Sequence, residues 1–190
     1  MDEDISLIDE FLQGNESSFN RLVLKHQKRV FNIIYAILSN YEETNEAAQD
    51  VFVSVYRSLK NFRKESNFAT WLYRIAVNQA RNRYNKVKRI ARVTYSIDDP
   101  IYAEEGEIER SIPDTNTAVN ELEKKELNRK ISDSISQIPM KYKEVVILRD
   151  VEGMDYMEIQ NVTGLNEGTI KSRLHRGRCF LKDLLKKAGT

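Results

Sequence analysis

The stretch from Asp155 to Leu185 constrains the fold more than any other part of the chain. Asp155 and Glu158 have the spacing of a helix-capping box, and a short apolar stripe follows them until Gly164 interrupts it. A second apolar stripe then recurs at helical spacing. Its inward residues are Ile170, Leu174, Gly177, Leu181 and Leu184. Two short helices across a glycine turn, the second of them basic, predict a helix-turn-helix that binds the DNA major groove.

The outward face of this second helix carries the candidate contacts to duplex DNA. They are Lys171, Ser172, Arg173, His175, Arg176 and Arg178. The alternative is an ordinary amphipathic helix whose basic face is only solvated. His175 and Cys179 are four residues apart, but two ligands are too few for structural zinc, so we expect no metal.

The composition favours an all-α protein, because seven glycines and three prolines in 190 residues leave long uninterrupted helical patterns. A single cysteine permits no intramolecular disulfide and suits a reducing cytoplasm. The chain begins Met-Asp-Glu-Asp, where a secretory signal would be basic, and no run of about 18 apolar residues occurs. We therefore expect a cytoplasmic protein that does not enter a membrane.

The net charge of +1 hides a strong asymmetry along the chain. Residues 1–93 carry a net charge of +4, residues 94–123 carry −8, and residues 124–190 carry +5. Two basic bodies on either side of an acidic connector suggest two regions that face nucleic acid, although a charged linker can also be merely solvated.

The N-terminal third is predicted to form three amphipathic helices. The first ends at Gly14, the second begins at a cap on Ser17, and the third spans residues 41–62. His26 stands among three cations and is expected on the surface.

The third of these helices is acidic on the side opposite its apolar residues. The residues of this acidic face are Glu42, Glu43, Glu46, Gln49 and Asp50. Negative charge would repel DNA phosphates, so the face either docks a protein partner or is simply exposed to solvent.

A polar loop over residues 61–68 leads into a basic helix, for which Ser66 or Asn67 can serve as the cap. From Arg74 to Arg92 there are seven Lys or Arg residues and no acidic one, interleaved with aromatic and amide side chains. Exposed bases stack on aromatic rings for about 1 to 3 kcal/mol each, and phosphates attract the cations. This pattern suits single-stranded or melted nucleic acid.

Arg74, Asn78 and Asn82 recur every fourth residue along one face, which favours contact with nucleic acid. Leu72 and Ile75 are expected in the core. For Trp71 the sequence leaves two alternatives, a place in the core or stacking on a base.

Residues 94–120 contain Pro100, Gly106 and Pro113 without a helical apolar period, which predicts a flexible acidic linker. Two further helices, separated at Pro139, are expected to support the helix-turn-helix. The predicted organisation is therefore two small helical domains, 1–93 and 121–190, joined by a linker over 94–120.

Taken together, the chain resembles the extracytoplasmic-function (ECF) group of RNA polymerase sigma factors, in the sigma-70 family. The resemblance covers almost the whole chain, and it depends on the order of four motifs. These are residues 46–52 (EAAQDVF), 68–78 (FATWLYRIAVN), 138–145 (IPMKYKEV) and 167–178 (EGTIKSRLHRGR). It implies a sigma-2-like domain, an acidic linker threaded through polymerase and a sigma-4-like domain.

The resemblance also implies a role for each matching residue. Glu46, Gln49, Asp50 and Phe52 match the helix that binds the clamp coiled coil of the polymerase β′ subunit. The loop 61–68 matches the one that captures a flipped base of the minus-ten element. Residues that match those reading the minus-35 element as a duplex are Lys171, Ser172, His175 and Arg176, whereas Arg173 and Arg178 are expected at phosphates. The implied minus-ten contacts are Asn61, Phe62, Ser66, Phe68, Trp71, Arg74, Asn78, Arg81 and Asn82.

The function predicted on this basis is a promoter-specificity subunit that binds core polymerase, including its β flap, and promoter DNA under the control of an anti-sigma factor. It needs no cofactor. It is not expected to be an enzyme, because no Walker loop, zinc-spaced cluster or nucleophile–base set is present. The alternatives are a helix-turn-helix regulator that does not replace the housekeeping sigma factor and, more remotely, an enzyme acting on nucleic acid.

Overall fold

The computed structural model describes residues 3–94 and 129–188, and every regular element in these two ranges is helical. The elements are α1 (Glu3–Leu12), α2 (Glu16–Leu38), α3 (Tyr41–Ser58), η1 (Leu59–Asn61), α4 (Phe68–Thr94), a helical segment 129–137, α6 (Met140–Val146), the π-helical turn η2 (Ile147–Val151), α7 (Tyr156–Thr163) and α8 (Glu167–Ala188). The predicted all-α class is confirmed. The predicted linker falls, apart from Thr94, outside the described residues.

Local sequence explains most helix ends. Gly14 has a φ of 100° and follows α1, as predicted. Asn40 caps α3, because its side chain accepts a hydrogen bond from the Glu43 backbone N–H at 2.9 Å. Asn67 does the same for the Thr70 N–H at 3.2 Å, which selects it over Ser66 as the cap of α4.

One predicted helix start was wrong. The N-cap of α2 is Asn15 rather than Ser17, and the Ser17 hydroxyl donates to Asn15 Oδ1 at 2.7 Å instead of capping the backbone. Both residues are good caps by type, so the turn set by Gly14 decides between them.

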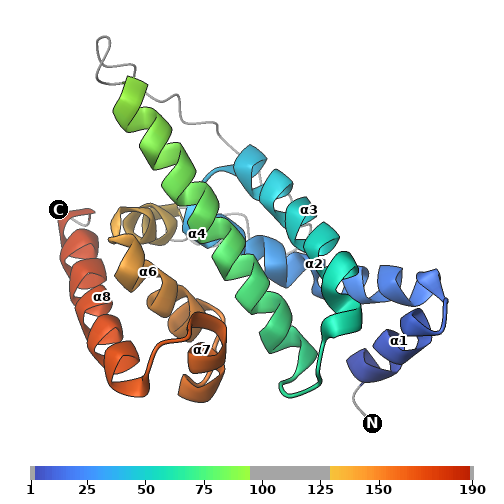
Figure 1. The fold of residues 1–190 in the computed structure, drawn as a ribbon. Helices are drawn as coiled ribbons and strands as arrows, with labels where there is room; N and C mark the ends of the chain where they lie inside the picture. Colours follow the sequence, from blue (N-terminus) through green and yellow to red (C-terminus); the bar gives the residue numbers. More distant parts are fainter. Residues whose placement is uncertain (1–2, 95–128, 189–190) are drawn as a thin grey trace, which may run out of the picture.

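The long helix α4 is the central element of the molecule. Figure 1 shows it between α1–α3 on one side and α6–α8 on the other. It packs against α2 and α3 within the N-terminal domain and against α7 of the C-terminal domain. The core residues Val30, Leu72, Val77 and Ile159 are all fully buried, and a single apolar cluster runs through both domains.

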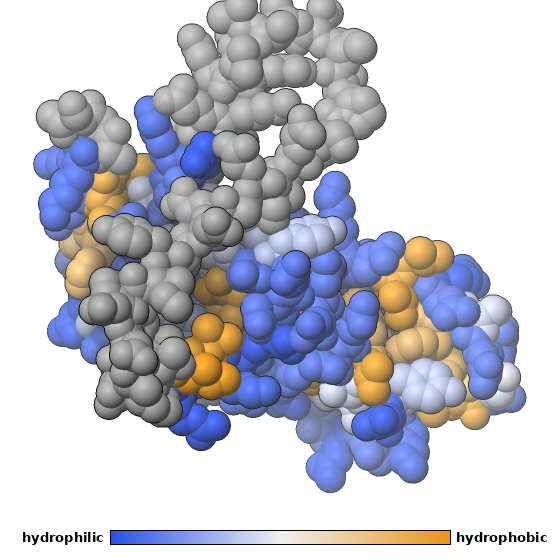
Figure 2. Space-filling view, turned by 90° about the horizontal axis from the view of Figure 1, so that it is seen from above, coloured by the Kyte–Doolittle hydropathy of each residue, from blue (hydrophilic) through white to orange (hydrophobic). Residues whose placement is uncertain are grey.

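On the face seen in Figure 2, the described residues are mainly hydrophilic, with apolar colour gathered in a few patches. Within the described residues, no helix is long and apolar enough to span a membrane.

Candidate nucleic-acid and protein interfaces

The helix-turn-helix is built as its sequence predicts. The Asp155 side chain accepts from the Glu158 N–H at 2.8 Å while Glu158 Oε2 accepts from the Asp155 N–H at 2.9 Å, so the capping box at the start of α7 is complete. Gly164 ends α7 in the left-handed conformation at φ 73°. Asn166 then accepts from the Thr169 N–H at 2.8 Å and caps α8.

The helix α8 has the two faces that its spacing predicts. Ile170 and Leu174 are buried, and Gly177 lies against α6 where no larger side chain would fit without a shift. Five of the six predicted DNA contacts are exposed, and Arg173 is half-buried. The exposed ones are Lys171, Ser172, His175, Arg176 and Arg178.

Several of these cations have partners within the protein. Arg178 makes a two-pronged ion pair with Asp150, at 2.6 and 3.0 Å, and Lys171 pairs with Glu167 at 2.6 Å. Arg176, followed by Lys141, lowers the pKa of the Tyr142 hydroxyl by hydrogen bonding. Because Lys171 and Arg178 are charge-neutralised in this arrangement, their contact with phosphate requires exchange of the carboxylate for DNA.

The predicted minus-ten residues run from Asn61, the last residue of η1, through the loop that follows and along α4 to Asn82. Phe62, Phe68 and Trp71 form one aromatic cluster, with ring centroids 5.2 to 5.9 Å apart. Phe62 and Trp71 are partly exposed, whereas Phe68 is 1% exposed and also contacts His26. The ring of Phe68 is therefore not accessible to a base in this arrangement, and we assign it the role of supporting Phe62 and Trp71.

The polar residues of this set differ in exposure. Asn61, Arg74, Asn78 and Asn82 are exposed, Ser66 is half-buried, and Leu72 belongs to the core as predicted. The other predicted contact on α4, Arg81, is half-buried because the C-terminal domain covers it.

The contact that covers Arg81 links the two domains. Arg81 Nε and Nη2 donate to the two carboxylate oxygens of Glu144 at 2.6 and 2.9 Å, and the Glu144 side chain is only 4% exposed. Arg29 makes a similar contact from α2, donating to Glu152 Oε2 at 2.8 Å and to the Glu152 carbonyl at 2.7 Å. Sequence reasoning missed both pairs, because their members are 63 and 123 residues apart and carry no local signal.

A buried lysine lies at the same interface. Lys143 is 2% exposed, and its ammonium donates to the Ser136 carbonyl at 2.7 Å and approaches the Ile37 carbonyl of α2 at 3.5 Å. It also lies 5.7 Å from the ring centre of Tyr84. Burial lowers the pKa of Lys143 from 10.5 to about 8.

The prediction that His26 lies on the surface was wrong. His26 is 6% exposed, its Nε2 lies 2.9 Å from Asp4 Oδ2, and its Nδ1 lies 3.5 Å from the Tyr73 hydroxyl. The histidine joins α1 to α2 and α4, which neighbouring cations in the sequence could not reveal.

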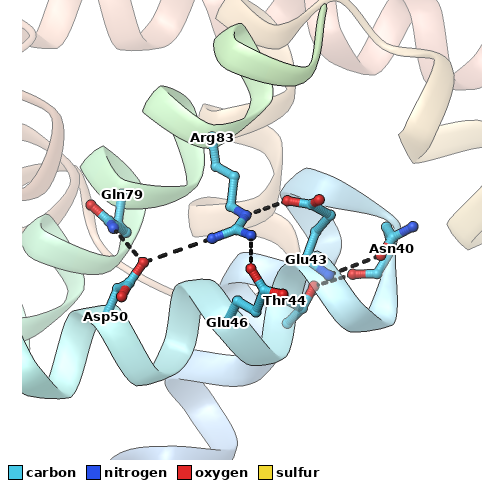
Figure 3. A network of polar contacts seen from close by, with 7 residues as sticks. All are labelled: Asn40, Glu43, Thr44, Glu46, Asp50, Gln79 and Arg83. Carbon is cyan, nitrogen blue, oxygen red and sulfur yellow. Dashed lines mark hydrogen bonds and ion pairs between the residues drawn. The ribbon is translucent and has the colours of Figure 1, made fainter. Parts of the chain in front are cut away.

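The acidic face of α3 carries the predicted polymerase contacts. Glu46, Gln49 and Asp50 are exposed, and Phe52 is half-buried. Figure 3 shows that Glu43, Glu46 and Asp50 converge on Arg83 of α4, a residue that the sequence did not single out.

Comparison with known proteins places both domains. Residues 22–90 match the family Sigma-70 region 2, and residues 128–181 match Sigma-70, region 4. The chain is 33% identical over 183 residues to the ECF RNA polymerase sigma-E factor of Haemophilus influenzae, covering 95% of this chain and 94% of that protein. It is 31% identical over 180 residues to the RNA polymerase sigma-H factor of Pseudomonas aeruginosa, covering 93% and 91%. The chain therefore belongs to the sigma-70 family, within the ECF group of RNA polymerase sigma factors.

Solved structures share the arrangement of the helices. CnrH in complex with the cytosolic domain of CnrY matches with a TM-score of 0.70 at 24% identity, over 98% of this chain and 99% of that one. The sigma factor RpoE of Bartonella quintana, in complex with the anti-sigma factor NepR, matches with a TM-score of 0.69 at 20% identity, over 88% and 96%. At these identities the likeness describes the fold.

Proposed function

We propose that this sigma factor binds core RNA polymerase through the acidic face of α3 and places it on promoters with a minus-35 and a minus-ten element. One observation carries the proposal: a chain that matches both sigma-70 regions in order exposes Asp50 on α3 and Arg176 on α8, where contacts to polymerase and to DNA are expected. Residues 1–93 and 121–190 are the two working domains, and 94–120 connects them.

The DNA contacts divide by chemistry. The exposed face of α8 suits duplex DNA, because Arg176 can donate two hydrogen bonds to a guanine edge while its neighbours meet phosphates. The partly exposed rings of Phe62 and Trp71, with Arg74 and Asn78 beside them on the chain, suit an unstacked base and a melted strand. The first domain therefore opens the DNA that the second domain helps to position.

The domains have to separate before both contacts can form. By their names, the two promoter elements are centred about 25 base pairs apart. At 3.4 Å per base pair, this separation is about 85 Å along DNA. In the packed arrangement α4 contacts α7 directly, and Arg81 is held by Glu144. The packed form is therefore a resting state, and polymerase binding has to break the pairs that Arg29 and Arg81 make.

The chain is expected to act in the cytoplasm, with polymerase, and to catalyse no reaction of its own. A structural relative bound to an anti-sigma factor supports a partner of that kind here. Such a partner would hold the chain away from polymerase until a signal arrives.

Binding to purified core polymerase without DNA tests the proposal. We expect the wild-type chain to bind and the charge reversal Asp50→Lys to weaken binding by roughly tenfold or more, since an interfacial charge pair is replaced by repulsion. Glu65→Lys is the control, because its side chain is 76% exposed and lies outside α3. A wild-type chain that binds no polymerase would reject the proposal and leave a helix-turn-helix regulator. For a chain that does bind polymerase, run-off transcription on genomic fragments would identify the promoters.

A further inference from the structure

Three carboxylates lie close together on α3. Glu43, Glu46 and Asp50 are spaced by three and four residues, so they share one face of the helix. Like charges at this spacing repel each other and would splay flexible side chains apart. Their side chains are 36%, 67% and 55% exposed, so solvent reaches all three.

A single cation from the neighbouring helix gathers them. Arg83 projects from α4 toward α3, where Nε donates to Glu43, Nη2 donates to Glu46, and Nη1 lies 3.7 Å from Asp50 Oδ2 (Figure 3). Its side chain is only 20% exposed, less than any of its three partners. A guanidinium suits three acceptors spread along a helix face, because its five donors are set in a rigid planar fork.

The network leaves one oxygen of each carboxylate available. Arg83 contacts Glu43 Oε2, Glu46 Oε2 and Asp50 Oδ2, and Gln79 donates to the same Asp50 oxygen at 3.2 Å. Among the described residues, the second oxygen of each carboxylate takes part in none of these contacts. Arg83 therefore fixes the acidic row through one oxygen of each side chain.

We propose that Arg83 is a positioning residue that preorganises Glu43, Glu46 and Asp50 to receive a row of arginine or lysine side chains from core polymerase. This inference rests on the proposed function, because it gives the same face a built-in support. It also adds Glu43, the N-terminal member of the row, to the residues that the family resemblance matched to polymerase contacts.

Two effects of Arg83 oppose each other at this surface. Its positive charge reduces the long-range attraction of a basic partner, but salt screens exposed charges beyond about 8 Å at physiological ionic strength. Its hydrogen bonds hold three acidic side chains in one arrangement, so less conformational freedom is lost when the partner binds. Because the acids are exposed and the guanidinium is mostly covered, the second effect is the larger.

Polymerase binding by Arg83 variants tests the inference at physiological salt. We expect Arg83→Gln to weaken binding about five- to tenfold, mainly through faster dissociation. Arg83→Lys should lie between Arg83→Gln and wild type, because one ammonium keeps the charge but cannot reach all three carboxylates. Arg89→Gln is the matched control: it removes the same charge from an exposed site on α4, outside the network, and should bind within twofold of wild type.

Two further readouts separate positioning from a merely structural role. The thermal unfolding midpoint and the affinity of α8 for duplex minus-35 DNA should change little in Arg83→Gln, since neither depends on the order of the acidic row. Binding as tight as wild type, or tighter, would overturn the inference and make Arg83 a competitor for the partner's cations. If Asp50→Lys still weakens binding roughly tenfold or more in that case, the proposed function survives and only the role of Arg83 fails.

Discussion

Gly177 is the residue where a single methyl group matters most to the C-terminal domain. A Cβ at this position would lie 2.5 Å from Val146 Cγ2 and 3.4 Å from both the Cβ and the carbonyl oxygen of Tyr142. Val146 is fully buried and β-branched, so it cannot turn away cheaply. The glycine allows α8 to approach α6 closely.

We expect Gly177→Ala to lower the free energy of unfolding by about 1 to 2 kcal/mol. Overpacking costs about 1 to 3 kcal/mol, and the better helix propensity of alanine offsets up to about 1 kcal/mol of it. Gly168→Ala is the control within α8, because its Cβ would meet only Asn166 Oδ1 at an ordinary 3.7 Å. Chemical denaturation measures both variants, and equal stabilities would contradict the packing argument.

Among single elements, α8 shows how much of a helix can be predicted from the local spacing of its residues. Its cap, its buried stripe and its exposed basic face all follow from the spacing of residues in the sequence. The partners of its cations do not, because Asp150 belongs to η2 and reaches Arg178 only through the fold. The sequence therefore predicted which side chains face outward, but not which of them are already paired.

Arg176→Ala tests whether α8 reads bases. With polymerase bound, we expect a loss of about 1 to 3 kcal/mol in promoter binding and a relaxed preference at one or two minus-35 positions. Promoter variants at each minus-35 position would measure it. Lys182→Ala, an exposed cation further along α8, should leave that preference unchanged. An equal loss on every sequence would instead identify Arg176 as a phosphate contact.

For α3 and α4, the sequence showed the acidic face and the basic helix but not their connection. Arg83 was one of seven cations on α4 with nothing local to distinguish it. Only the crossing of the two helices brings it under Glu43, Glu46 and Asp50.

At the scale of the whole molecule, the two domains meet through charged groups with little exposure. Glu144 and Lys143 are adjacent on α6, and both face the N-terminal domain. Burial of a charge without full compensation is costly, so the stability of the packed arrangement depends on solution conditions through these groups. They are well placed to make the packed form reversible.

The lowered pKa of Lys143 predicts that the free energy of unfolding rises with pH. Its pKa is about 8 in the folded protein and 10.5 when exposed, so the folded state binds fewer protons between these values. The cost of burying the charged amine is therefore fully present below about pH 8 and fades as the pH rises toward 10.5. In that window the free energy of unfolding should rise through this group.

The comparison that isolates this effect is with Lys143→Met, which cannot titrate. Denaturation at pH 7.5 and pH 9.5 should show the stability of wild type rising relative to the variant, whatever their difference at the lower pH. Lys182→Met, whose lysine is exposed, should keep a constant difference from wild type. A constant difference for Lys143→Met as well would mean that the amine is not buried at the interface in solution.

The sequence by itself determined the helical class, the ends of α1 and α7, the two faces of α8 and the family to which the chain belongs. The helix ends and the two faces of α8 depend on residues within one or two helical turns of each other, which local spacing records directly, whereas the family depends on the order of four motifs along the chain. The tertiary structure alone decided that His26 is buried, that Glu144 covers Arg81, and that Arg83 orders the acidic row. Each of these joins residues that are distant in the chain, and one charged side chain can pair with any opposite charge until packing selects its partner.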